Sequence, residues 1–388
     1  MSFHAKPVMP QGFTCASKNC GIKKEGNDLS LFYSEAEANA AAVFTQNQFP
    51  GAPVKVGREI LRKGKLRAIV VNSKVSNVGT GEEGVKNARR MGAAAAKELG
   101  VPTDEVIMSS TGVIGKPLPV ELIEAGVAGM KTLLAPDPMV GALGIMTTDT
   151  KPKALSMSVG NATLAIVGKG SGMIEPNMAT MLVYIFTDAA IPSKTLDGML
   201  REAVKDSFNM LSVDTDTSTS DTCVILANGL AGNVDAKAFQ TALNEICVGM
   251  TKLLARDGEG ATKLLVTHVE GAKNEAEARK IAKSLVNSPL VKTMAYGADP
   301  NVGRIMMAVG KCFDCEVVQS KIEASISGKL VYWNESRVDF DEAEVRKLLS
   351  GELVEISVNL NVGGGSATAY GCDLTEGYIK ENAAYYSS

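Results

Sequence analysis

The chain has 388 residues, of which 45% are hydrophobic and 21% charged, and its formal net charge is -3 at pH 7. This length can bury a large core in one big domain or in two to three smaller ones, and the dispersed basic residues argue against nucleic acid as the main partner. No apolar run approaches the roughly 20 residues of a membrane span and the N-terminus lacks a secretory signal pattern, so we expect a cytoplasmic globular protein.

Strand and helix patterns alternate along the chain. Thr80 and Glu83 form a capping box that opens a helix, and Gly100 ends it. The alternating segment 154–168 predicts a β-hairpin around Gly160. Mixed hairpins and helices favour α/β layers with largely antiparallel sheets over a doubly wound parallel sheet. The other expected elements are strands at 66–71, 105–110, 181–186, 222–228, 263–269, 316–333 and 352–360, and helices at 119–134, 193–210, 235–256, 274–287 and from 341.

Cysteine and histidine provide little chemistry in this sequence. The seven cysteines are odd in number and widely spread, which favours reduced thiols. Cys312 and Cys315 form the CxxC pattern, and without a second pair or a nearby histidine we interpret them as half-buried strand cysteines. His4 lies in a loose N-terminus, and His268 lies in a strand pattern typical of a core residue. Acid-base chemistry must then come from other groups, such as carboxylates or lysine.

Three glycine-rich stretches invite comparison with nucleotide-binding loops. SSTGVIGKP lacks the P-loop spacing, and Pro117 cannot donate the N–H that such a loop supplies. GKGSGMIEP lacks the third glycine of a dinucleotide-binding loop and has Pro176 where a helix should run. NVGGGSA leads from one strand into another. We interpret all three as tight turns or as places where backbone approaches a ligand closely.

The stretch KGSGMIEPNMATMLVYIF places a single hydroxyl, Thr180, between a glycine-rich loop and an apolar strand. A threonine can act as a nucleophile without histidine if its own α-amine is free to accept the hydroxyl proton. The hydroxyl could free that amine by attacking the Ala179 carbonyl, which gives an ester that water then hydrolyses. The residues alone leave this open, since a threonine that enters an apolar strand is commonly a packing residue.

Nine sequence blocks, in one order, resemble the ornithine acetyltransferase family, also called glutamate N-acetyltransferases or bifunctional arginine-biosynthesis proteins. The resemblance covers the whole length of the chain. The blocks are GFTCASKNCGIKK, VFTQNQFPGAPV, SSTGVIGKPLP, MTTDTKPK, KGSGMIEPNMATMLVYIFTDA, SVDTDTSTSDT, ARDGEGATK, ADPNVGRIM and CDLTEGYIKENA.

The resemblance implies a self-cleaving enzyme. The cut between Ala179 and Thr180 would give an α chain of residues 1–179 and a β chain of residues 180–388. Thr180 would be the nucleophile and, through its amine, the general base of a ping-pong acetyl transfer from N2-acetylornithine to glutamate. Thr111 and Gly112 match the family's oxyanion hole, and a glycine turn after a strand can indeed direct donors at a developing alkoxide.

The resemblance also implies a set of substrate contacts. Lys169 can pair with a substrate carboxylate or lower the pKa of the Thr180 amine, and Glu259 suits a substrate ammonium group. Without the family blocks, Lys169 and Glu259 would be interpreted as solvated surface charges. The residues that match the family's substrate contacts are Thr147, Lys169, Thr180, Glu259, Asn382 and Ser387.

The family's fold is a layered α/β/β/α sandwich of mostly antiparallel sheets with helices outside, shared with a related aminopeptidase family. Its α and β chains interleave in one catalytic unit and assemble as two of each. No metal or bound cofactor is implied, and acetyl-CoA would be a substrate only if the enzyme also performs the first step of arginine biosynthesis.

The chain departs from the family pattern at five positions. These changes put donor and acceptor preference in doubt more than the nucleophilic chemistry. They are Lys74 and Thr215 for glycines, Val302 for tryptophan, Ala384 for an acid and Ser387 for threonine.

Alternative functions remain open at this point. The chain could be a related aminopeptidase, an acetyltransferase that acts beside an antibiotic pathway, or an uncleaved amino-acid-binding relative without activity. The EGATK and C-terminal blocks favour acetyl transfer. A denaturing gel separates the cleaved enzyme from the uncleaved relative.

Overall fold

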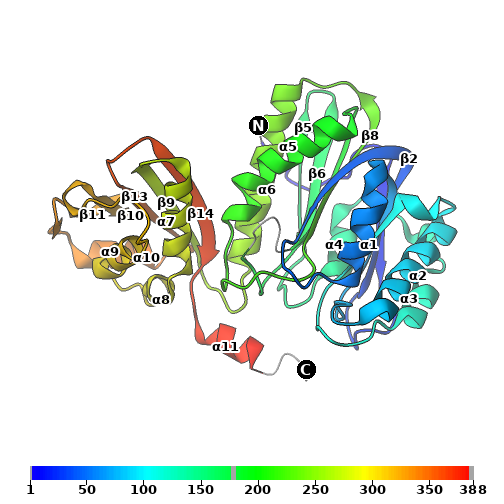
Figure 1. The fold of residues 1–388 in the computed structure, drawn as a ribbon, viewed down its shortest axis with the longest axis horizontal. Coiled ribbons are helices and arrows are strands. Elements are labelled where there is room, and N and C mark those ends of the chain that lie inside the picture. Colours follow the sequence, from blue (N-terminus) through cyan, green and yellow to red (C-terminus); the bar gives the residue numbers. More distant parts are fainter. Residues whose placement is uncertain (1, 176–180, 384–388) are drawn as a thin grey trace. The chain divides into compact units, whose positions relative to one another are not determined.

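The computed structural model describes residues 2–175 and 181–383 (Figure 1). The chain divides into two compact units, and each draws on separate stretches of sequence. Unit 1 consists of Met1–Gly170, Pro176–Asn209 and Thr217–Met250, and unit 2 of Ser171–Glu175, Met210–Asp216 and Thr251–Ser388.

Unit 1 is built from one strongly bent sheet and its covering helices. Its strands are β1 (Phe13–Lys18), β2 (Leu29–Phe44), β3 (Lys65–Asn72), β4 (Val106–Ser110), β5 (Lys153–Val159), β6 (Ala162–Lys169), β7 (Leu182–Ala189) and β8 (Thr222–Gly232). Its helices are α1 (Ala52–Ile60), α2 (Gly81–Leu99), α3 (Val120–Val127), α4 (Pro138–Ile145), α5 (Ser193–Lys205) and α6 (Ala236–Arg256), the last of which runs on into unit 2.

Strand β2 belongs to both halves of this sheet, whose order is β4-β3-β2-β8-β7-β6-β5, with β1 also paired to β2. Its first half pairs with β1 and β3, the register shifts between Tyr33 and Ala38, and its second half pairs with β8. The bend lets the two halves face each other. Phe32 accordingly packs against Tyr184 and Phe186 with ring centroids 5.3 Å apart.

These contacts make unit 1 a four-layer structure. One core fills the space between the two sheet halves, with Phe13, Ile69 and Leu226 among its members. A second core lies between the outer face of β1 to β4 and the helices α1, α2 and α3, with Val70 and Met91 among its members. On the opposite side α5 packs on β2 and α6 packs on β5 and β6 (Figure 1). The expected α/β/β/α sandwich of mostly antiparallel strands is confirmed.

Unit 2 contains a six-stranded sheet in the order β12-β11-β10-β13-β9-β14. Within this sheet only β9 and β13 pair in parallel among the described strands, and the other pairs are antiparallel. Helix α7 packs on β9 and β14, and α10 packs on β10 and β13. The strands are β9 (Leu264–Ala272), β10 (Glu323–Ile326), β11 (Lys329–Trp333), β12 (Ser336–Arg337), β13 (Leu353–Asn359) and β14 (Gly365–Cys372). The helices are α7 (Glu275–Asn287), α8 (Pro289–Gly297), α9 (Val302–Gly310), α10 (Glu342–Leu349) and α11 (Glu376–Asn382).

Several expected elements differ from the structure. The helix expected at 119–134 is α3 followed by a separate short turn, because Gly129 adopts φ 79° between them. The expected capping box is wrong, since the Thr80 side chain makes no bond to the helix and its hydroxyl donates to Asn77 Oδ1 at 2.8 Å. Cys312 and Cys315 lie in a turn after α9 rather than in a strand.

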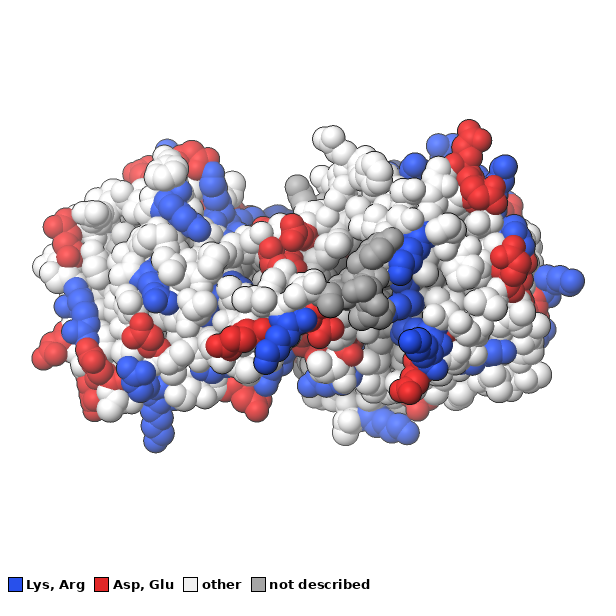
Figure 2. Space-filling view, turned by 90° about the horizontal axis from the view of Figure 1, so that it is seen from below, with Lys and Arg blue, Asp and Glu red and all other residues white. Residues whose placement is uncertain are grey.

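Surface charge and hydropathy are ordinary over the described residues. No described helix combines the length and apolar character that a membrane crossing needs. On the face shown in Figure 2, acidic and basic side chains are interspersed. Each of the seven cysteines is a free thiol. His268 bonds Thr368 Oγ1 through Nδ1 at 2.9 Å, but its side chain is 44% exposed, so its assignment to the core is wrong.

Candidate active site

The Thr111-Gly112 turn lies where β4 ends beside β3. These two strands are parallel, so their carboxyl ends meet at the same edge of the sheet. The Thr111 N–H donates to Asn72 O at 3.1 Å, and the Val113 N–H donates to Lys74 O at 3.0 Å. No described residue accepts a hydrogen bond from the Gly112 N–H. The turn can therefore present a backbone donor, as an oxyanion hole requires.

Gly112 is required at this turn by space as well as by conformation. Its φ is 126°, and a Cβ there would lie 2.2 Å from the carbonyl carbon of Lys74. The two loops therefore pack backbone against backbone, and any side chain at this position would push them apart.

If Gly112 supplies the oxyanion donor that the family resemblance implies, Gly112→Ala should lower kcat for the expected acetyl transfer on the order of 100-fold with little change in KM, because the backbone donor moves away from the oxyanion. Gly115→Ala is the matched control, since Gly115 also has positive φ (82°) but no atom within 4 Å of its Cβ position. Steady-state kinetics of both variants tests this. Equal losses in the two variants would show that backbone strain alone is responsible.

Lys169 brings three of the predicted site residues together in unit 1. Its Nζ donates to Thr147 Oγ1 at 2.8 Å and to Thr111 Oγ1 at 3.4 Å. Lys169 is the last residue of β6 and pairs in register with Leu182 of β7. Its side chain is only 9% exposed. A buried ammonium group beside two hydroxyls is a suitable site for a carboxylate.

Asp149 holds this cluster in place, although the sequence had not marked it as a site residue. Its carboxylate accepts a hydrogen bond from the Lys153 ammonium at 2.7 Å. It also accepts hydrogen bonds from the backbone N–H groups of Thr147 at 3.0 Å and Gly170 at 2.8 Å. The Lys169 ammonium lies 3.9 Å away. Burial raises the pKa of Asp149, but the two lysines and these hydrogen bonds outweigh burial and lower the pKa from 3.8 to about 2. The spacing of four residues between Asp149 and Lys153 was the sequence signal from which this ion pair could have been predicted.

Glu259 and Asn382 meet in unit 2, as the resemblance implied. Asn382 Nδ2 donates to Glu259 Oε2 at 2.7 Å. The Glu259 N–H donates to Ser171 O at 2.9 Å, and the Glu259 carboxylate lies over Gly172, where a Cβ would be 2.2 Å from it. The second glycine of KGSG therefore makes room for the carboxylate of EGATK.

The C-terminal block is fixed to the EGATK loop by further polar contacts within unit 2. Asp373 accepts the N–H groups of Thr262 and Lys263 at 2.8 and 2.9 Å. Tyr378 directs its hydroxyl at Asp214 Oδ2, 3.4 Å away. Burial, with Asp214 and Glu259 close by, raises the pKa of the Tyr378 phenol. Tyr378 and Asp214 are additional polar groups beside Glu259 that the sequence did not single out.

Three predicted site residues lie outside the described residues: Ala179, Thr180 and Ser387. The others form two groups, one in unit 1 around Lys169 and one in unit 2 around Glu259. In the described part of the chain no cluster of three metal-ligating side chains occurs.

Two of the departures from the family pattern occupy left-handed backbone. Lys74 has φ 80° and Thr215 has φ 69°. Glycine adopts this region without strain, whereas a β-branched residue there is a true outlier. Both residues therefore occupy backbone that would suit glycine better.

We expect Thr215→Gly to stabilise the protein by about 1 kcal/mol, since glycine relieves the left-handed strain. Thr215 is exposed, so its side chain contributes little packing. Thr215→Ala is the control, because alanine retains a Cβ at the same φ and should recover less. Urea unfolding of both variants measures the difference, and an unchanged or lower stability of the glycine variant would contradict the expectation.

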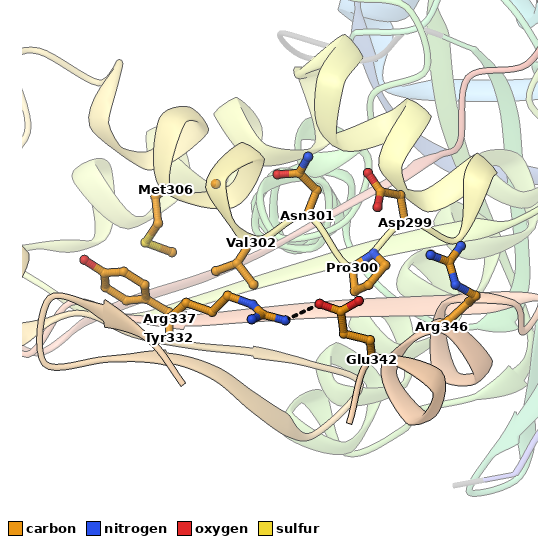
Figure 3. Close-up of a pocket in the computed structure, with 10 residues that line it drawn as sticks. Asp299, Pro300, Asn301, Val302, Met306, Tyr332, Arg337, Glu342 and Arg346 are labelled. Atoms are coloured by element: carbon orange, nitrogen blue, oxygen red, sulfur yellow. Dashed lines mark hydrogen bonds and ion pairs between the residues drawn. The ribbon is translucent and has the colours of Figure 1, made fainter. Parts of the chain in front are cut away.

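A surface pocket of about 390 Å³ lies in unit 2 at the ADPNVGR block (Figure 3). Val302, Asp299 and Arg346 line it, and Arg337 donates to Glu342 at 2.6 Å across one side. Val302 lines this pocket at the position where the family resemblance leads us to expect tryptophan, and a larger side chain there would fill part of the space.

The comparisons with known proteins agree with the blocks in the sequence. Residues 14–387 match the ArgJ family. The chain belongs to the ArgJ family. It is 47% identical over 382 residues to arginine biosynthesis bifunctional protein ArgJ 2 of Clostridium acetobutylicum. This match covers 97% of this chain and 98% of that protein. It is 43% identical to glutamate N-acetyltransferase Oat2 of Streptomyces clavuligerus, with 98% of each chain covered.

A solved structure adds support for the fold. The crystal structure of arginine biosynthesis bifunctional protein argJ from Bacillus halodurans matches with a TM-score of 0.51 and 43% identity. The match covers 52% of this chain and 98% of that chain. The resemblance inferred from the sequence is therefore confirmed at the level of family and fold.

Proposed function

We propose that this chain transfers acetyl from N2-acetylornithine to glutamate through an acetyl-threonine intermediate on Thr180. It is a glutamate N-acetyltransferase of arginine biosynthesis. The Streptomyces clavuligerus relative is named for this activity, and the Clostridium acetobutylicum relative is named for the pathway. The observation that carries the catalytic proposal is the Lys169 ammonium, which bonds the Thr147 and Thr111 hydroxyls beside the strand that follows Thr180.

Self-cleavage prepares the nucleophile. The Thr180 hydroxyl oxygen attacks the Ala179 carbonyl, the C–N bond breaks, and the nitrogen takes the hydroxyl proton to become an amine. Water then hydrolyses the ester, which leaves a carboxylate on Ala179 and restores the hydroxyl of Thr180. The new amine has an unperturbed pKa of about 8, which suits a general base near neutral pH.

The transfer itself uses the same hydroxyl twice. Thr180 attacks the acetyl carbonyl while its amine takes the proton, and Thr111 and Gly112 stabilise the oxyanion. The ornithine amine leaves with that proton. The amine of glutamate then attacks the acetyl ester, the bond to the Thr180 oxygen breaks, and the proton lost by the glutamate amine passes through the Thr180 amine to that oxygen, which gives N-acetylglutamate and restores the hydroxyl. Lys169 would pair with a substrate carboxylate, and Glu259 would bind a substrate ammonium group. Thr147, Asn382 and Ser387 match further substrate contacts of the family, and the Ser387 hydroxyl suits a carboxylate.

Acetyl-CoA is a second proposed donor, since the relatives are described as bifunctional. We also propose two copies each of the α chain (residues 1–179) and the β chain (residues 180–388), on the family resemblance. A cytoplasmic location suits the free state of the seven cysteines, because thiols stay reduced there.

A denaturing gel of the purified protein tests the proposal. Two bands that correspond to residues 1–179 and 180–388, with the second starting TMLVY, are expected. Transfer to glutamate is then measured from acetylornithine and from acetyl-CoA. A single full-length band that persists on long incubation would favour an uncleaved binding protein, and two bands without transfer from either donor would indicate another acyl group or amine.

A further inference from the structure

Asp221 is a buried carboxylic acid at the start of β8, in the SVDTDTSTSDT block. Its residue is 1% exposed. Strand β8 runs parallel to β7, Thr222 pairs in register with Leu182, and the Thr222 N–H donates to Met181 O at 2.9 Å. Asp221 is therefore placed beside Met181, the residue that follows Thr180 in the sequence.

Polar groups lie around this carboxyl group. The hydroxyl groups of Ser218 and Thr45 and the backbone N–H of Met181 lie against it. Thr45 also fixes the main chain, since its N–H donates to Asp221 O at 3.0 Å and its hydroxyl to Ser218 O at 2.7 Å. Yet Asp221 Oδ2 has no hydrogen-bond partner among the described residues. A buried polar atom left in this state weakens the fold, so its presence calls for a role other than stability.

The charge state of Asp221 follows from its surroundings. Burial raises the pKa of Asp221 well above 3.8, and the hydrogen bonds and the Lys169 ammonium only partly offset this. An uncharged carboxyl group still has an acceptor oxygen and one O–H donor. An ionised Asp221 would instead attract the Lys169 ammonium and compete with a substrate carboxylate for it.

We propose that Asp221 is a positioning residue for acyl transfer, whose buried carboxyl group holds the main chain at Met181, at the start of β7. This inference rests on the proposed function, because the group it positions is the nucleophile that precedes Met181. The same carboxyl would align that residue for self-cleavage.

Asp221→Asn and Asp221→Ala test this in the full-length protein. Asparagine matches the shape of the uncharged acid, so kcat is expected to stay within about threefold of wild type. Alanine removes the acceptor for Met181, and kcat is expected to fall on the order of 100-fold with an unchanged KM for acetylornithine, because Lys169 remains. Asp339→Asn is the matched control, since Asp339 is exposed and far from either strand in sequence.

Thermal unfolding gives a second readout. Because burial raises the pKa of Asp221 in the folded state, wild type is expected to lose stability relative to Asp221→Asn as pH rises, so the margin by which this variant melts above wild type should be larger at pH 7 than at pH 4. A lower melting temperature of this variant at both pH values would contradict the uncharged state.

The outcomes separate this inference from the proposed function. Wild type that neither cleaves nor transfers acetyl overturns both, whereas active wild type leaves Asp221 to be judged by its variants. A kcat for Asp221→Asn as low as that of Asp221→Ala would show that the carboxylate is the working form. If Asp221→Ala folds and has the kcat of wild type, Asp221 contributes to packing only and does not position the nucleophile. If Asp221→Ala does not fold, the asparagine variant decides alone.

Discussion

Replacement of Thr180 by alanine is expected to leave the chain as one full-length band of 388 residues and to abolish acetyl transfer. In the proposed mechanism this change removes both the hydroxyl that attacks the Ala179 carbonyl and the nucleophile that carries the acetyl group. Because cleavage also frees the amine that serves as general base, one substitution eliminates two catalytic groups. Loss of a nucleophile of this kind costs on the order of 10⁶-fold in rate.

Thr180→Ser is the matched control, since serine keeps the hydroxyl and, once released, the amine. We expect it to yield the same two bands, with slower cleavage, and measurable transfer. Gel electrophoresis over time and an acetyl-transfer assay measure both variants. If Thr180→Ala gave the same two fragments as wild type, a contaminating protease or another nucleophile would be responsible for the cut.

Asp149→Asn is expected to destabilise the protein by about 3–5 kcal/mol at neutral pH, the typical cost of removing one partner of a buried ion pair. The side chains of Asp149 and Lys153 are 0% and 1% exposed, so water cannot replace the lost carboxylate. Urea unfolding measures the loss. Asp197→Asn is the control, because the exposed Asp197–Arg201 pair is worth only about 0.3–0.5 kcal/mol.

The pH dependence of this effect has a definite sign. The folded state lowers the pKa of Asp149 from 3.8 to about 2, so its stabilisation is complete above the unfolded value and is lost as pH falls through the folded value. The gap between wild type and Asp149→Asn should therefore narrow between pH 4 and pH 2. A gap that is constant over this range would show that packing, and not charge, carries the contribution.

Local sequence signals predicted many of the elements, and tertiary context explains those that were missed. The hairpin around Gly160 and the helix capped by Asn274 follow from turn and capping chemistry that involves only neighbouring residues. Strand β2 was missed because its two halves pair with different strands and its burial pattern changes at the register shift. Such pairing depends on partners more than 150 residues away in sequence, such as β8.

In the candidate site, too, some residues could be predicted from sequence motifs whereas others depend on tertiary context. The nucleophile and the oxyanion turn were predicted from the motifs and the family resemblance, but the supporting groups Asp149 and Asp221 were not. Both are charged residue types whose burial is decided by strands and loops distant in sequence. The positive φ angles of Lys74 and Thr215 could not be predicted either, since neither residue type favours positive φ.

The order of strands in unit 1 has a consequence for the cut chain. Strands β7 and β8 follow Thr180 in sequence, yet they lie between β2 on one side and β6 on the other, both of which precede it. If the Ala179–Thr180 bond is cut as we propose, the two products remain joined along both edges of this strand pair by backbone hydrogen bonds. They can separate only by unfolding the sheet, so dilution alone should not release one product from the other, and each enzyme molecule keeps the α chain with which it was synthesised.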